Sequence, residues 1–430
     1  MAYEIKYRSE DEMKDSGIEW LGKIPKECEI LPVKRIFKLK RDKSFDKEPK
    51  ILSLTQKGII ERDISNNEGQ IAASYEGYVK VEVGDFVLNP MDLVSGYVDK
   101  SRYEGVISPA YITFTNIDNR INLDFYKFYF QMLYHHKYLF PFGEGVSFVH
   151  RWTLKNEIFL NYPILKNEKI NQHKIANFLD IKTSEFDSII SKKELLIKKL
   201  EEAKKSLISE VVTGKVKIVD GELVDRKPEE MKDSGVEWLG MIPKDWETTY
   251  FKRVMLIQNG KEILDEDKDI DKAVNVYGSG GVFKYTSNYL YEGESVLFGR
   301  KGTIGKPIYI KEKFWTVDTM YYTKFEDSTI GKFVYYLLLI FPWSKITTQT
   351  ALPSIVGTDL SNSICTMPSL NQQQEIVKFL DVKYMQINSI ITKTQKQITK
   401  LKEAKQSLIS EAVTGKIDLR DWEIIETGGR

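Results

Sequence analysis

Two blocks of this sequence each occur twice. Residues 13–29 read MKDSGIEWLGKIPKECE, and a near copy begins 218 residues later at Met231. Residues 200–215 read LEEAKKSLISEVVTGK, and a near copy begins 201 residues later at Leu401. The segments between the blocks are not repeated, and the first is 17 residues longer than the second. A period this long duplicates whole domains rather than the small units of a solenoid. The chain therefore has a repeated frame that carries two different inserts.

The repeat at residues 172–216 and 373–417 has the pattern of a coiled coil, with apolar residues at alternating spacings of four and three. The predicted contact positions are Ile175, Leu179, Lys182, Phe186, Ile189, Lys193, Leu196, Leu200, Ala203 and Leu207, and then Ile376, Leu380, Lys383, Ile387, Ile390, Thr394, Gln397, Leu401, Ala404 and Leu408. We expect two long helices that pair antiparallel. The alternative is that each helix packs on its own globular domain.

Polar residues and helix signals refine this prediction. Lys182 and Lys383 occupy matching positions, which suggests that they set the register of the pair. Gly214 and Gly415 are suited to end the two helices. Ser369, with a glutamine three residues later, is typical of a capping box at the start of the second helix.

The inserts have the sequence pattern of mixed α/β domains. Runs rich in β-branched and aromatic residues predict strands, and two aromatic-rich runs predict helices. The predicted strands lie within 78–88, 106–114, 295–298 and 307–310, and the predicted helices lie within 122–138 and 332–341.

Composition excludes several classes of protein. The net charge of +1, from 63 basic and 62 acidic residues, neither requires nor excludes a polyanionic partner. Two cysteines and four histidines lack metal-ligand spacing, so we expect neither a disulfide framework nor a metal site. No apolar signal segment is visible at the start, and the apolar run at 333–341 is too short to span a bilayer. We expect a soluble, cytoplasmic protein that is not associated with a membrane.

Two segments resemble a nucleotide-binding motif and a methyltransferase motif, but each lacks residues that the motif requires. The segment GRKGTIGKP at 299–307 has P-loop character, but its glycine spacing is wrong and Pro307 replaces the hydroxyl residue that binds magnesium. A basic glycine-rich turn that meets DNA is the better interpretation, with a solvated hairpin as the alternative. Asn89-Pro90-Met91-Asp92 is similar to the Asn-Pro-Pro-aromatic tetrad of N6-adenine methyltransferases but lacks the second proline and the aromatic residue. No catalytic residue is predicted.

Short polar, basic and aromatic side chains in the inserts are candidates for contacts with base edges and phosphates. In the first insert they are Lys100, Ser101, Arg102, Tyr103, Ser147, His150 and Arg151, and in the second they are Ser279, Arg300, Lys301, Thr303, Lys306, Thr348, Gln349 and Ser354.

The repeated frame resembles the specificity subunit of type I restriction-modification systems. The resemblance rests on WLGKIP at 20–25 and WLGMIP at 238–243, on QHKIANFLD at 172–180 and QQEIVKFLD at 373–381, and on the two SLISE endings. It covers nearly the whole chain.

This resemblance implies an α+β fold in which two mixed α/β target recognition domains are joined by two long antiparallel coiled-coil helices. The implied divisions are 1–165, 166–216, 217–367, 368–417 and a tail at 418–430. The implied function is non-catalytic recognition of a bipartite, asymmetric double-stranded DNA sequence. The implied partners are two modification subunits that methylate adenine and the restriction subunits, which would hold S-adenosylmethionine, ATP and magnesium; this chain would hold no cofactor.

Two other functions fit parts of the sequence. A coiled-coil scaffold with two domains that bind ligands other than DNA would suit the near-neutral charge. A self-contained methyltransferase is the third possibility, for which the sequence offers no complete motif.

Overall fold

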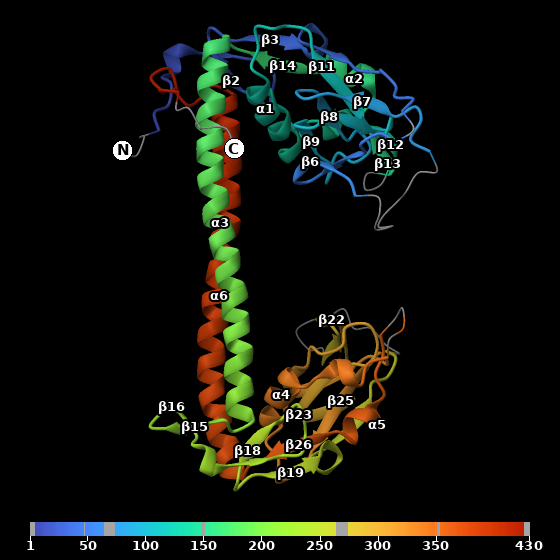
Figure 1. The fold of residues 1–430 in the computed structure, drawn as a ribbon, viewed down its shortest axis with the longest axis vertical. Helices are drawn as coiled ribbons and strands as arrows, with labels where there is room; N and C mark the ends of the chain where they lie inside the picture. Colours follow the sequence, from blue (N-terminus) through green and yellow to red (C-terminus); the bar gives the residue numbers. More distant parts are fainter. Residues whose placement is uncertain are drawn as a thin grey trace. The chain divides into compact units, whose positions relative to one another are not determined.

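The chain forms two compact units. The computed structural model describes residues 5–46, 48–63, 74–147, 151–263, 274–348, 350 and 353–424. Unit 1 comprises Met1–Lys192 together with Gln397–Arg430, and unit 2 comprises Lys193–Lys396. Each unit therefore contains one insert and a part of both long helices (Figure 1).

Unit 1 contains a four-stranded antiparallel sheet in the order β4-β11-β8-β9. Helix α1 lies against this sheet, and its Phe130 meets Phe37, Phe86 and Phe114 in an aromatic core. The elements are β1 (Met13–Asp15), β2 (Lys23–Pro25), β3 (Glu29–Pro32), β4 (Phe37–Leu39), β5 (Leu52–Thr55), β6 (Gly58–Glu61), β7 (Val79–Val81), β8 (Phe86–Leu88), β9 (Val98–Lys100), β10 (Gly105–Ile107), β11 (Ile112–Asn116), α1 (Leu123–His135), β12 (Glu144–Ser147), β13 (Arg151–Thr153), α2 (Asn156–Asn161) and β14 (Pro163–Lys166), with 3₁₀ turns η1 (Glu10–Glu12), η2 (Val33–Arg35) and η3 (Phe140–Phe142).

Unit 2 contains a six-stranded sheet in the order β20-β25-β23-β24-β21-β22, in which only β21 and β24 run parallel. Helix α4 packs on this sheet through buried Phe333, Val334 and Leu337. The elements are β15 (Val216–Val219), β16 (Glu222–Asp225), β17 (Met231–Asp233), β18 (Met241–Pro243), β19 (Glu247–Tyr250), β20 (Met255–Asn259), β21 (Val274–Gly278), β22 (Gly281–Thr286), β23 (Tyr291–Gly299), β24 (Ile308–Thr316), β25 (Met320–Phe325), α4 (Gly331–Ile340), α5 (Gly357–Ser361) and β26 (Ile364–Met367), with 3₁₀ turns η4 (Pro228–Glu230), η5 (Phe251–Arg253) and η6 (Trp343–Lys345). The mixed α/β prediction for both inserts is confirmed.

The frame adopts the same local structure in both copies. The hairpin β1–β2 pairs Met13 with Pro25, and β17–β18 pairs Met231 with Pro243. The strand before each insert also pairs with the strand after it, as β3 with β14 and β19 with β26. Each insert therefore starts and ends on two neighbouring strands. Its size and internal topology can change without altering the frame.

Two helices of 44 residues follow the inserts, α3 (Lys169–Val212) and α6 (Leu370–Val413). Each spans about 66 Å at about 1.5 Å per residue. The predicted signals are confirmed: Ser369 and Gln372 exchange capping hydrogen bonds, and Gly214 and Gly415 have φ of +70° and +75°. At the first of these ends the amide of Lys215 donates to the carbonyl of Glu210, which is the bond expected of a Schellman motif.

The two long helices pack antiparallel, as predicted. In unit 1, buried Leu179 of α3 shares a core with Ile409 and Val413 of α6. In unit 2, buried Ile208 of α3 shares a core with Leu380 of α6. The start of α3 thus meets the end of α6, and the end of α3 meets the start of α6.

The predicted contact positions are wrong by one residue at four positions in each helix, whereas the first position of each series, Ile175 or Ile376, is buried as predicted. Ile189 is 44% exposed, whereas its neighbour Ile190 is 7% exposed. The repeat explains the error, because adjacent apolar residues satisfy two phases of the heptad and a straight helix drifts against a strict seven-residue period. The positions Lys182, Leu196 and Ala203 are replaced by Thr183, Ile197 and Lys204, and Lys383, Ile390, Gln397 and Ala404 are replaced by Tyr384, Ile391, Ile398 and Lys405.

The register role predicted for Lys182 and Lys383 is therefore also wrong. Lys182 pairs with Glu185 on its own helix at 2.9 Å, and the Lys383 ammonium lies over the ring of Phe379 on its own helix. Neither lysine is seen to contact the opposite helix.

A different pair of lysines joins the two helices. Lys204 donates to Asn388 at 3.0 Å in unit 2, and Lys405 pairs with Asp187 at 2.7 Å in unit 1. Both lysines and both acceptors are related by the 201-residue offset of the repeat. The two side chains are only 15% and 20% exposed, and a slip of register would separate each ammonium from its partner on the opposite helix, leaving Lys204 only its pair with Glu201 on its own helix.

A buried glutamine ties each long helix to the helix of its insert. Gln172 is fully buried, accepts from the amide of Asn122 at the start of α1 and donates to the carbonyl of Asn167. Gln373 accepts from the amide of Ile330 at the start of α4 and donates to the carbonyl of Pro368. Each glutamine amide is therefore satisfied on both its oxygen and its nitrogen, and it fixes the position of the insert helix.

The C-terminal segment completes unit 1. Ile417 forms an antiparallel bridge with Tyr7, and the matching residues of unit 2, Val216 and Asp225, pair in the hairpin β15–β16. Trp422 packs edge-on against Phe178 and its indole donates to Asn177. The pairing that a continuous hairpin makes in unit 2 is therefore made in unit 1 between two segments far apart in the sequence, one near Tyr7 and one near Ile417.

Two further features bear on the sequence predictions. The cysteines Cys28 and Cys365 are both buried free thiols, and burial raises the pKa of each to about 12. Within the described residues, no helix is both long enough and apolar enough to cross a membrane.

The adjacent residues Ile189 and Ile190 test the corrected contact positions of α3. Ile190→Asp should lower the free energy of unfolding by about 2–5 kcal/mol, because it buries a carboxylate at the helix contact. The matched variant Ile189→Asp should change it by no more than about 1 kcal/mol, since this side chain faces solvent. Urea denaturation of both variants measures the difference. Equal losses would contradict the assigned contact positions.

Candidate nucleic-acid interface

Two loops of the second insert come together to form one surface. The loop after β23 carries Arg300 and Lys301, and its carbonyl at Arg300 accepts from the amide of Ile355 at 3.0 Å. Lys301 forms a bridge with Ser354, and the amide of Gly302 donates to the carbonyl of Pro353. Residues that lie about fifty positions apart in the sequence are therefore held within one backbone hydrogen-bond network.

Hydroxyl groups stabilise the second of these loops. Thr348 Oγ1 lies 3.0 Å from Ser354 Oγ and accepts from the Ser354 amide at 3.0 Å. Thr348, Lys301 and Lys306 are exposed, and Arg300 is half-buried with its guanidinium over the ring of Tyr321. Of the residues predicted in this insert, the structure brings together Arg300, Lys301, Thr303, Thr348 and Ser354, and Lys306 is exposed further along the same loop.

Ser279 lies beside this surface, in the turn between β21 and β22. The strand before it runs parallel to β24, whose end leads into the turn at Val317–Thr319. The amide of Arg300 donates to the carbonyl of Thr319, and the amide of Val317 donates to the carbonyl of Tyr277. The Ser279 turn and the Arg300 loop therefore flank the same turn at one end of the sheet.

The predicted group at Lys100–Tyr103 in the first insert divides into two kinds of residue. Lys100 pairs with Asp124 of α1. Ser101 is fully buried, and its hydroxyl donates to the carbonyl and accepts from the amide of Tyr103. Arg102 and Tyr103 are exposed. This geometry argues against a DNA contact by Ser101, whose hydroxyl holds a turn, and leaves Arg102 and Tyr103 available.

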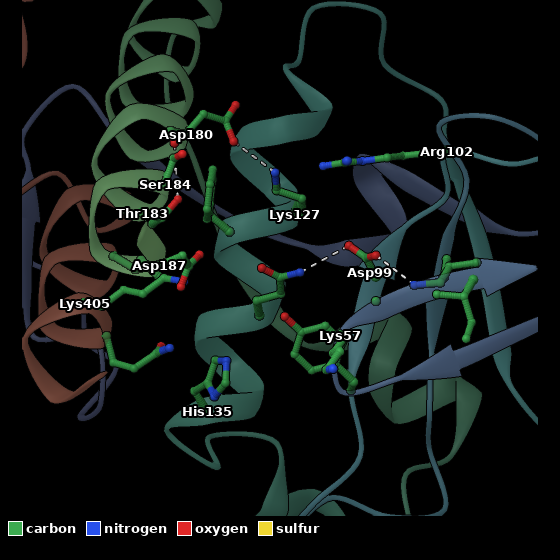
Figure 2. Close-up of a pocket in the computed structure, with 18 of the residues that line it drawn as sticks. Lys57, Asp99, Arg102, Lys127, His135, Asp180, Thr183, Ser184, Asp187 and Lys405 are labelled. Atoms are coloured by element: carbon green, nitrogen blue, oxygen red, sulfur yellow. Dashed lines mark hydrogen bonds and ion pairs between the residues drawn. The ribbon is translucent and has the colours of Figure 1, made fainter. Parts of the chain in front are cut away.

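Arg102 and Tyr103 line a cavity of about 500 Å³ between the insert and the long helices of unit 1 (Figure 2). An ion pair and a hydrogen bond connect residues that line it. Lys127 of α1 pairs with Asp180 of α3 at 3.2 Å, and the Gln131 amide donates to Asp99 at 3.2 Å. No described residue forms a hydrogen bond or ion pair with the Arg102 guanidinium, so its charge is available at the cavity.

The pKa values of His135 and Tyr97, which line this cavity, are shifted from their usual values. Burial lowers the pKa of His135, and the neighbouring His136 and Lys405 lower it further, so this imidazole is neutral. Burial raises the pKa of Tyr97 to about 12, with a further contribution from Asp99 and Asp187. The positive charge at the cavity therefore comes from its lysines and Arg102.

Two of the remaining predicted residues of the first insert, Ser147 and Arg151, lie on the paired strands β12 and β13. Ser147 pairs with Arg151 across this hairpin, and Trp152 forms a parallel bridge with Asp92. The side chains of Ser147 and Arg151, and the whole of His150 and Gln349, lie outside the described residues. This hairpin and the Lys100–Tyr103 segment are not joined by any hydrogen bond that the structure shows.

The sequence reading missed the contacts that hold each insert on the frame. Lys127 pairs with Asp180 in unit 1, and Lys332 pairs with Asp381 in unit 2 at 2.8 Å. The two aspartates are identical residues at the 201-residue offset, so the repeat contained a signal for them. The lysines belong to the inserts and have no matching offset.

The described residues contain no group of three or more His, Cys, Asp or Glu side chains that could hold a metal ion. The polar side chains assembled in the second insert are instead basic and hydroxyl groups on a glycine-rich turn. Such groups suit phosphate and base-edge contacts.

Comparison with known proteins gives a consistent family. Residues 243–400 match the model of the type I restriction modification DNA specificity domain. The specificity subunit of the type I restriction enzyme MjaVIII from Methanocaldococcus jannaschii is 25% identical over 379 residues, which cover 80% of this chain and 83% of the relative. Residues 243–400 therefore carry a type I restriction modification DNA specificity domain, and the chain as a whole is similar to the specificity subunit of a type I restriction enzyme.

One solved structure shares the fold of this chain. A chain from a study of complex assembly and conformational transition of the type I R-M system aligns with a TM-score of 0.67 at 12% identity, over 91% of this chain and 98% of that chain. The HsdS subunit from Thermoanaerobacter tengcongensis aligns with a TM-score of 0.42 at 12% identity, over 91% and 98%. Specificity subunits of this family are generally free of cofactors.

Proposed function

We propose that this specificity subunit reads a bipartite, asymmetric double-stranded DNA target, with one half read by each insert. The repeated frame supports two readers held in the same way, because β3–β14 and β19–β26 bracket the inserts identically. The inserts themselves differ, with a four-stranded sheet in one and a six-stranded sheet in the other. Different reading surfaces favour two different half-sites, and hence a target that is not palindromic.

The proposed domain divisions follow the frame. Residues 1–165 and 217–367 are the two target recognition domains, 166–216 and 368–417 are the helices that separate them, and 418–430 is a tail. The strand β14 lies at the end of the first division and α3 begins directly after it, which supports the boundary at residue 165.

In the second domain, the assembled loops around Arg300 and Ser354 are the proposed DNA-contact surface. Lys301 and Lys306 would bind phosphates as point charges, and Arg300 and Thr348 have side chains suited to base edges. In the first domain, Arg102 and Tyr103, together with Ser147 and Arg151 on β12 and β13 and the neighbouring His150 in the sequence, are proposed for the other half-site.

The partners proposed for this chain are two modification subunits and the restriction subunits. S-adenosylmethionine, ATP and magnesium would be bound by those partners. A system that modifies the cell's own DNA would act in the cytoplasm.

Two copies of one modification subunit need two copies of one docking surface. The outer faces of the long helices provide it, because Lys199, Glu202 and Ser206 on α3 are exposed and are identical to exposed Lys400, Glu403 and Ser407 on α6. In unit 1 this face borders a groove of about 680 Å³ lined by Glu403, Ser407 and the imidazoles of His135 and His136. We propose that each modification subunit docks on one of these faces.

Exchange of one domain tests whether each target recognition domain reads its own half of the DNA target. Replacing Ser44–Tyr162 with the equivalent segment of another specificity subunit should change one half of the methylated sequence and leave the other half unchanged. The bracketing strands β3 and β14 stay native in this chimaera, so the frame is retained. Genome-wide mapping of methylated adenines measures the outcome. A change in both halves, or in neither, would show that reading is not modular.

Salt dependence tests the basic loop of the second domain. Lys301→Ala and Lys306→Ala should each weaken DNA binding by the assembled complex and reduce the slope of log affinity against log salt by about 1, because each removes one phosphate contact. Lys313→Ala is the matched control, since Lys313 is about half exposed on β24 and pairs with Glu292. Its slope should equal that of the native chain. Unchanged slopes for Lys301→Ala and Lys306→Ala would remove this loop from the DNA surface.

Charge reversal tests the repeated docking faces. Glu202→Lys and Glu403→Lys should each reduce the number of bound modification subunits from two to one, and the double variant should bind none. Native mass spectrometry counts the subunits. Glu157→Lys on α2 is the control, because Glu157 is exposed but is not repeated at the matching position. Two bound subunits on the double variant would place the docking surface elsewhere.

A further inference from the structure

The first insert contains a cavity whose lining differs from that of the charged cavity in Figure 2. Its volume is about 620 Å³, within the range of small-molecule sites. Three tyrosine rings, one methionine thioether and two serine hydroxyls line it: Tyr75, Tyr78, Tyr111, Met91, Ser53 and Ser108. Flat aromatic rings with a few hydroxyl groups are the lining that a planar heterocycle requires, since the rings stack and the hydroxyls bind ring nitrogens and exocyclic groups.

The hydroxyl of Tyr75 is the most informative group in this cavity. The Tyr75 oxygen is buried and has no hydrogen-bond partner among the described residues. The ring itself is held edge-on against Tyr78 at a centroid distance of 5.3 Å. A buried hydroxyl without a partner is costly to a folded protein. It is accounted for if a ligand in the cavity supplies the missing donor or acceptor.

The cavity adjoins the hairpin that is proposed to meet DNA. Met91 belongs to the Asn89–Asp92 turn, in which the Asn89 side chain accepts from the Met91 amide. The next residue, Asp92, forms the bridge to Trp152 of β13, and the carbonyl of Pro90 accepts from the amide of Leu154. A base leaving a duplex bound at this hairpin would therefore meet an aromatic cavity.

We propose that this cavity receives an unstacked nucleobase of the first half-site. This inference rests on the proposed function, because it assumes that the first insert binds duplex DNA. Removing a base from the stack costs free energy, and stacking on aromatic rings in the protein offsets much of that cost. The protein would then distinguish DNA sequences by how easily a base pair opens, in addition to reading base edges. A free nucleoside would have the same ring chemistry, so the experiment separates the two sources.

The test measures binding of the assembled modification complex to duplexes that carry one mismatch at a time in the first half-site. A mismatched pair opens more easily, so one position should bind about tenfold more tightly than the matched duplex. Tyr75→Phe should reduce this gain severalfold by deleting the hydroxyl, and Tyr78→Ala should abolish it by deleting a ring of the cavity. Tyr250→Phe, on strand β19 outside the inserts, is the matched control and should keep the full gain.

The outcomes are separable. The methylated adenine is extruded by the modification subunit, so a gain at that position should be the same in all variants. If the gain at every position survives both Tyr75→Phe and Tyr78→Ala, the cavity does not receive a base. If those variants abolish binding of radiolabelled adenosine or thymidine and leave the mismatch gain unchanged, the ligand is a free nucleoside and the proposal is overturned.

Two further measurements complete the test. Tyr75→Phe should leave the melting temperature of the chain unchanged or higher, because it removes an unpaired buried hydroxyl; a lower value would give that hydroxyl a structural role and overturn the proposal. If the native complex binds matched DNA without sequence dependence, the proposed function itself is contradicted.

Discussion

The antiparallel contact between α3 and α6 is the interaction on which the rest of the structure depends. Apolar side chains bury the contact, and Lys204 and Lys405 cross it to reach Asn388 and Asp187. Apolar side chains can pack in more than one register, whereas these polar bonds across the contact form in only one. Through Gln172 and Gln373 the same helices hold α1 and α4. The place of each insert within its unit therefore follows from the helix contact.

The division between frame and insert has a mechanical basis. Each insert is bracketed by two neighbouring antiparallel strands, and its helix is held on the long helix by a buried glutamine and an ion pair, Lys127 with Asp180 or Lys332 with Asp381. Because these attachments lie on the bracketing strands and on one helix of the insert, the rest of the insert can change from a four-stranded to a six-stranded sheet. A specificity subunit needs this freedom, since a new DNA sequence requires a new surface on an unchanged frame.

The repeat and its local signals predicted much of the frame. The capping residues at Ser369, the helix ends at Gly214 and Gly415, and the two long helices are confirmed, because short-range hydrogen bonding determines them. The contact phase was wrong, since Ile189 and Ile190 are equally apolar and only the opposite helix selects between them. Ser101 was misread for a similar reason. A serine in a polar run looks exposed in sequence, but here its hydroxyl closes a buried turn.

The sequence by itself determined the duplicated architecture, the helices and the family, because those depend on periodicity and on motifs that recur at constant offsets. Only the tertiary structure decided which residues share a surface. It joined the Arg300 loop to Ser354 across about fifty residues, and it placed Tyr75 and Tyr78 around the same cavity as Tyr111. Contacts of this kind depend on strand pairing between distant segments, which local pattern does not encode.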